Sequence, residues 1–110
     1  MTDFIQGTRH FGIVVRNLTN SITFYEELGL KIIKQMEESG KHIDTMLSLN
    51  DVNVTTVKMS SPNNDTLIEL LHYKTPLPKN IERKINDFGP SHLAFTVKNL
   101  SENYKKLSEK

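Results

Sequence analysis

The chain repeats part of itself, and this repeat restricts the possible folds more than any other feature of the sequence. At an offset of 82 residues, segment 9–28 aligns with segment 91–110, and five of the 20 aligned positions are identical. Typical compositions give roughly one or two identities by chance. The identical pairs are His10/His92, Val15/Val97, Asn17/Asn99, Leu18/Leu100 and Glu27/Glu109. Because these pairs span a strand, a turn and a helix start in register, we interpret them as a duplicated unit rather than a coincidence.

Each copy has the pattern of a strand followed by a turn and a helix. Segment His10–Arg16 is short and rich in β-branched residues, which is typical of a strand. Asn17 is an N-cap residue type, and apolar residues then recur at helical spacing as far as Leu28. Gly29 is suited to the left-handed backbone that ends many helices. The second copy is predicted to repeat this order, with a strand from His92 and a helix over residues 102–110.

The segment between the copies predicts more sheet. Strands are expected over Lys31–Met36, Val52–Met59 and Thr66–Tyr73, and Ile43–Leu49 fits one face of a short helix. Proline-rich residues 74–90 are predicted to form a connector with a helical turn over residues 80–88. The expected fold class is therefore α+β: a βαβββ module over residues 9–73, the linker 74–90, and the first βα of an incomplete second module over residues 91–110. All of it belongs to a single domain, residues 1–110.

Composition excludes several classes of function. The chain has 110 residues, enough for one domain, and no cysteine, which rules out thiolate metal sites and thiol chemistry. The 14 basic and 13 acidic residues are interspersed, so nucleic acid is not expected as a partner. The longest apolar run is three residues, whereas a membrane span needs about 20. With no cysteine and no secretory signal at the N-terminus, we expect a cytoplasmic location.

Three residues are candidates for metal chemistry. His10 and His92 occupy equivalent positions in the two copies, so a pseudo-twofold axis would point both imidazoles into one cleft. Glu69 lies between apolar neighbours in a predicted strand, where an unpaired carboxylate is costly to bury. Two imidazoles and a carboxylate fit a divalent cation such as Zn, Ni, Co, Mn or Fe. The alternative, a structural histidine and an acid paired with Lys or Arg, is about equally consistent with the spacing.

The motifs of the chain resemble those of the vicinal oxygen chelate superfamily. They are HFGIVVRNL from His10, FYEELGL from Phe24, IELL from Ile68 and HLAFTVKNL from His92, and they occur in the family's order over nearly the whole chain. The family includes glyoxalase I (lactoylglutathione lyase), methylmalonyl-CoA epimerase, extradiol dioxygenases and bleomycin-resistance proteins. The stretch Val54–Tyr73 looks most like the glyoxalase-type and epimerase-type members. The resemblance implies a βαβββ module with a curved mixed sheet.

The resemblance also implies a site and a reaction. It makes His10, Glu69 and His92 metal ligands, whereas the family's usual fourth ligand, a Glu that also takes part in proton transfer, falls in strands that this sequence lacks. The chain is then expected to be a fragment of a longer protein, or to be completed by a partner chain. The leading expectation is a glyoxalase I-like lyase or isomerase that acts on a small carbonyl or thioester substrate through a metal-stabilised enediolate. The alternatives are an epimerase acting on an acyl-CoA, a protein that only binds its ligand, and a non-catalytic fragment or interaction module.

Assembly can be predicted from the expected sheet. One module has a curved, half-open sheet whose concave face needs another module to cover it. We therefore expect a homodimer, either symmetric or segment-exchanged.

Overall fold

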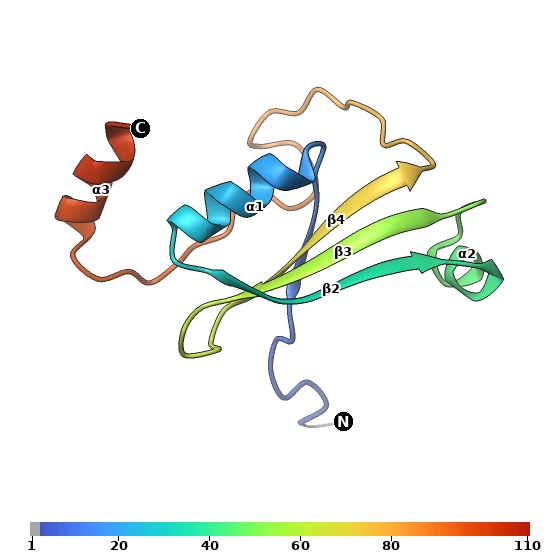
Figure 1. The fold of residues 1–110 in the computed structure, drawn as a ribbon, viewed down its shortest axis with the longest axis horizontal. Helices are drawn as coiled ribbons and strands as arrows, with labels where there is room; N and C mark the ends of the chain where they lie inside the picture. Colours follow the sequence, from blue (N-terminus) through green and yellow to red (C-terminus); the bar gives the residue numbers. More distant parts are fainter. Residues whose placement is uncertain (1–2) are drawn as a thin grey trace. The chain divides into compact units, whose positions relative to one another are not determined.

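The computed structural model describes residues 3–110, which divide into two compact units with a boundary between Lys79 and Asn80 (Figure 1). The first unit contains every strand that the structure shows in these residues. Its elements, in chain order, are β1 (Phe11–Val14), α1 (Leu18–Glu27), β2 (Lys31–Ser39), α2 (Lys41–Leu47), β3 (Asn53–Ser60) and β4 (Leu67–Thr75). The second unit contains α3 (Leu100–Ser108).

The four strands form one mixed sheet in the order β1-β4-β3-β2. β1 runs parallel to β4, and the β2–β3 and β3–β4 pairs are antiparallel. The parallel pair is possible because α1 and the strands that follow it provide a long connection between β1 and β4. This order places β1 and β2 at the two edges of the sheet.

Helix α1 covers one face of the sheet and forms the main core with it. Asn17 caps the helix, since its side-chain oxygen accepts a 3.0 Å hydrogen bond from the backbone N–H of Asn20. Gly29, with φ of 99°, turns the chain out of the helix into β2. The buried residues of this core are Leu30, Val57, Met59, Ile68 and Leu70, and the α1 side chains of Leu18, Ile22 and Tyr25 pack against them.

The opposite face of the sheet is covered only at one end. There Ile43 of α2 packs with Val52 and Val54, and Leu71 and Tyr73 of β4 lie against this second cluster. The carboxylate of Asp44 ties α2 to the start of β3 by accepting hydrogen bonds from the backbone N–H groups that follow the helix. The other end of the same face carries the polar residues discussed below.

The predicted order of elements is confirmed for residues 10–75. The structure extends β2 to Ser39 and resolves the segment around Ile43 as a helix. Phe24 of α1 is 54% exposed and contacts the ring of Tyr25 edge-on. Leu18, Ile22 and Tyr25 already fill the stripe that faces the sheet.

Two predictions for the second unit are wrong. The structure shows no strand over residues 92–98, and no β-ladder involves these residues in the described part of the chain. A strand needs a hydrogen-bonded neighbour, and unit 80–110 contains no second extended strand. The predicted helical turn over residues 80–88 is also absent: Lys84 and Asp87 form a local turn, and the Arg83 guanidinium donates to the carbonyl oxygens of Phe88 and Pro90.

Helix α3 confirms the last predicted element, although its N-terminus differs from that of α1. Asn99 has left-handed φ and ψ of 50° and 56°, and its side chain makes no capping hydrogen bond. The Nδ2 group of Asn103 instead donates to the carbonyl oxygen of Lys98 at 2.6 Å. None of the helices in residues 3–110 has the length and apolar character required to cross a membrane.

Candidate metal centre

The structure brings two of the three predicted ligands together on the face of the sheet opposite α1. β1 and β4 pair in parallel, with Gly12 opposite Glu69. His10 directly precedes β1, two residues before Gly12, and its side chain lies close to the Glu69 carboxylate. The distance from His10 Nε2 to Glu69 Oε2 is 3.9 Å. The His10 side chain is 34% exposed and that of Glu69 is 16% exposed, so solvent reaches the imidazole more easily than the carboxylate.

A third group, Lys58, approaches the same carboxylate oxygen. Lys58 lies directly opposite Glu69 in the β3–β4 pair, and its Nζ is 3.9 Å from Glu69 Oε2. The Lys58 side chain is 25% exposed. The Glu69 carboxylate therefore lies between an imidazole and an ammonium, which reduces the cost of its partial burial.

Sequence analysis missed Lys58, although a signal for it exists. The segment VNVTTVKM at residues 52–59 alternates in period two, and Lys58 is its single charged residue. The same argument that singled out Glu69, a lone charge in an otherwise uncharged strand, would have selected Lys58. What the strand pattern alone could not supply is the register that places the two charges opposite each other.

The third predicted ligand, His92, lies in the second unit. Its Nδ1 is 2.6 Å from the Oγ of the neighbouring Ser91. Within residues 3–110, no three His, Asp or Glu side chains lie close enough together to hold a metal ion. The structure thus brings His10 and Glu69 together, and a site that also includes His92 stays a prediction.

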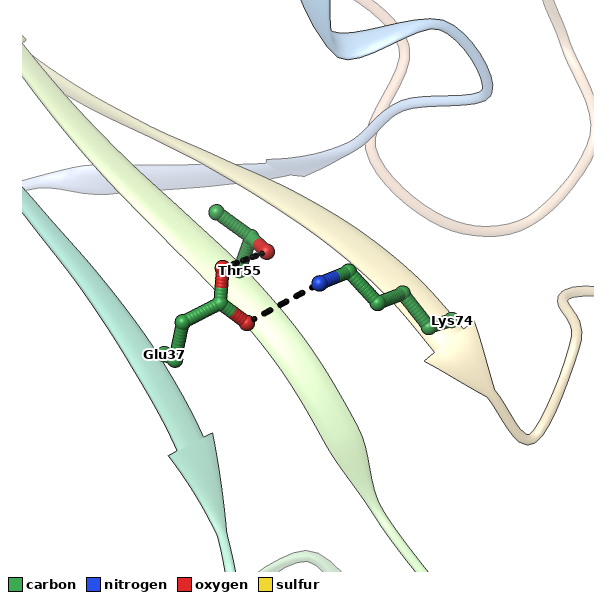
Figure 2. A network of polar contacts seen from close by, with 3 residues as sticks. All are labelled: Glu37, Thr55 and Lys74. Atoms are coloured by element: carbon green, nitrogen blue, oxygen red, sulfur yellow. Dashed lines mark hydrogen bonds and ion pairs between the residues drawn. The ribbon is translucent and has the colours of Figure 1, made fainter.

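The face of the sheet that α1 covers carries a separate polar network, shown in Figure 2. There the hydroxyl of Thr55 donates to Glu37 Oε1 at 2.7 Å, and Lys74 Nζ lies 3.3 Å from Glu37 Oε2. These residues line a cavity of about 480 Å³ near the start of α1, together with Arg16, Asn17, Leu18, Thr19, Gln35 and His72. His72 therefore points away from Glu69, as strand alternation predicts, and is not a candidate ligand.

The contacts of Glu37 lead to a testable prediction about its pKa. The hydrogen bond from Thr55, assisted by the Lys74 ammonium, lowers the pKa of Glu37 from its ordinary value. Because the folded-state pKa is the lower one, the stabilisation is present above the unfolded-state pKa and is lost as the pH falls through the folded-state value. We expect Thr55→Val to raise the Glu37 midpoint in a carboxyl NMR titration, and Thr56→Val to leave it unchanged. An unchanged midpoint in Thr55→Val would contradict this assignment.

The chain belongs to the Glyoxalase/Bleomycin resistance protein/Dioxygenase superfamily, since the model of that family matches residues 7–110. Among solved structures, the chain is similar to a glyoxalase family protein from Bacillus cereus. The two are 26% identical with a TM-score of 0.85, over 98% of this chain and 74% of that chain. The comparison with curated proteins gives no match. The resemblance inferred from the motifs and the glyoxalase-type α+β fold are both confirmed, and the family supports a metal-dependent enzyme or a ligand-binding protein.

His10 and Glu69 of the first unit fit a divalent cation. Imidazole nitrogen and carboxylate oxygen are ligands that first-row divalent metals accept. Two such donors on one zinc ion are typically about 3–3.5 Å apart, given metal–ligand distances of about 2.0–2.2 Å. The observed 3.9 Å between His10 Nε2 and Glu69 Oε2 is close to that separation. The pair therefore needs only a small side-chain adjustment to share a metal.

Proposed function

We propose that the protein is a divalent-metal-dependent lyase or isomerase of the glyoxalase I type, with His10, Glu69 and His92 as metal ligands. The observation that supports it best is the approach of His10 and Glu69 on the face of the sheet that α1 leaves open. The metal would be Zn, Ni, Co, Mn or Fe. The substrate would be a small carbonyl or thioester compound with adjacent oxygen atoms, and the reaction would begin with removal of a proton next to the carbonyl.

Each residue of the pair has a distinct role in this proposal. His10 would present a neutral nitrogen from the edge strand, and Glu69 would supply negative charge from the neighbouring strand. Gly12 follows His10 by two residues and lies opposite Glu69 in the β1–β4 pair. A Cβ at Gly12 would come within 3.2 Å of the Leu71 side chain, so a larger residue at this position would require Leu71 to shift. When bound, the metal would supply Lewis-acid chemistry that polarises the substrate oxygens.

The proposal is tested by metal binding and turnover in the same preparation. We expect calorimetric binding of Ni²⁺ or Zn²⁺ at one site per chain, and conversion of the hemithioacetal of methylglyoxal and glutathione to its thioester. His10→Ala should lower metal affinity at least about tenfold, because it removes a direct ligand. His72→Ala, which changes a histidine on the other face, is the matched control. Absence of metal binding in the wild type would overturn the proposal.

Two other functions stay open within the same family. Turnover of an acyl-CoA, read as exchange of its α-proton with solvent, would identify an epimerase instead of a glyoxalase. Ligand binding without metal and without turnover would identify a binding protein of the bleomycin-resistance kind. A homodimer, symmetric or segment-exchanged, also stays a prediction, and scattering in solution measures it directly.

A further inference from the structure

The open face of the sheet carries an unusual row of residues beside Glu69. Following the register across the four strands, Gly12 of β1 lies opposite Glu69 of β4, Glu69 opposite Lys58 of β3, and Lys58 opposite Lys34 of β2. Residues directly opposite each other project from the same face. The row therefore places Lys58 on the strand next to Glu69, and Lys34 beside Lys58 on the strand beyond it.

A β-bulge is responsible for the second lysine. Ile32 pairs with Met59, but the next pair is Lys34 with Lys58, so β2 contains one extra residue, Ile33. If β2 kept a regular register instead of this bulge, Ile33 would lie opposite Lys58 and Lys34 would project from the other face. Bulges redirect side chains in this way and are frequent near active sites. Here the bulge adds a second positive charge beside Lys58.

The lysine pair is unfavourable for the sheet by itself. Like charges directly opposite each other on adjacent strands are destabilising. Glu69 offsets the charge of Lys58 at 3.9 Å, whereas Lys34 has no ion pair within residues 3–110. A metal on Glu69 would also take up part of the negative charge that now faces Lys58. Both ammonium groups would then lack an anion.

We propose that Lys58 and Lys34 form a subsite for an anionic group of the substrate, such as a carboxylate or a phosphate, next to the metal. This inference rests on the proposed function, because it places the anion beside the metal held by His10 and Glu69. It narrows the substrate class from small carbonyl compounds in general to those that carry a negative charge close to the reacting oxygens. Lys58 and Lys34 are specificity residues in this proposal.

The test uses two probes that differ by one carboxylate. Propionohydroxamate supplies adjacent oxygens for a metal, and the monohydroxamate of succinic acid adds a carboxylate to the same carbon chain. Titrated calorimetrically into the full chain at saturating Ni²⁺, the second probe is expected to bind the wild type about tenfold more tightly. In Lys34→Met and Lys58→Met the two probes should bind within about twofold of each other. Lys74→Met, a lysine on the opposite face, should keep the wild-type preference, and raised salt should reduce it.

The outcomes separate this inference from the proposed function. Equal binding of both probes to the wild type, or an unchanged preference in both Lys34→Met and Lys58→Met, overturns the subsite and leaves the metal site standing. Failure of both probes to bind the Ni²⁺-treated wild type overturns the metal site and the subsite together. Lys34→Met keeps the test decisive if Lys58→Met does not fold, because Lys34 makes no ion pair that the described fold depends on.

Discussion

Glu69→Gln is expected to lower the affinity for divalent metal by about 100-fold or more, which corresponds to about 3 kcal/mol. The amide keeps the shape of the side chain but removes the negative charge that attracts a doubly charged ion at close range. Glu69 is also the one carboxylate beside His10, so no neighbouring acid in the described ion pairs replaces it. Isothermal titration with Ni²⁺ or Zn²⁺ measures the change, and lyase activity should fall in parallel.

The matched control for this variant is Glu37→Gln. Glu37 also accepts a hydrogen bond from Thr55 and forms an ion pair with Lys74, but it belongs to the network on the α1 side of the sheet. We expect its metal affinity to stay within about twofold of the wild type. Circular dichroism and thermal unfolding establish that both variants are folded. Retention of near wild-type metal affinity by folded Glu69→Gln would remove Glu69 from the site.

Ile68→Ala is expected to destabilise the protein by about 2–5 kcal/mol, because it deletes buried carbon atoms and leaves a cavity. Ile68 is fully buried, and it pairs with Met59 on one side and Phe11 on the other. Since small domains have only about 5–15 kcal/mol of stability, part of the variant would be unfolded. Ile68→Val, with an expected cost of about 0.5–1.5 kcal/mol, keeps the effect measurable.

Urea unfolding measures both changes as shifts of the midpoint. The control is Ile33→Ala, since Ile33 is 56% exposed at the bulge and its truncation should change stability by no more than about 0.5 kcal/mol. Equal midpoints for Ile68→Ala and Ile33→Ala would contradict the assignment of the core to the α1 face of the sheet.

Local signals predicted most of the first unit. Asn17 and Gly29 mark the two ends of α1 because a side-chain cap and a left-handed glycine are local properties. The alternation in residues 52–59 predicts β3, although the structure buries side chains on both faces of this strand. The bulge at Ile33 could not be predicted in this way, since an extra residue in a strand is defined only by the partner strand. The strand predicted from His92 is absent for a related reason: β-propensity alone does not make a strand when no neighbouring strand is available for hydrogen bonding.

The residues of the candidate site were also predicted only in part. The internal repeat and the lone carboxylate in LIELL selected His10 and Glu69 as candidates, and the structure places His10 Nε2 3.9 Å from Glu69 Oε2. Lys34 was missed because lysine is common on exposed strands, and Lys58 was missed because the strand pattern does not show which residue lies opposite it in the neighbouring strand. Their significance depends on a four-strand row, which is a property of register and of the bulge.

The four-residue edge strand β1 couples the site to local opening of the fold. Its one partner in the sheet is β4, and His10 directly precedes it, whereas Glu69 lies in the interior of the sheet. Short edge strands detach at a lower free energy than central strands, so the two donors separate in openings that leave the rest of the sheet intact. The apparent affinity of the proposed metal site would then be reduced in proportion to the fraction of molecules with β1 detached. A bound metal would in turn hold β1 against β4, and it would slow the amide hydrogen exchange of β1 more than that of β3.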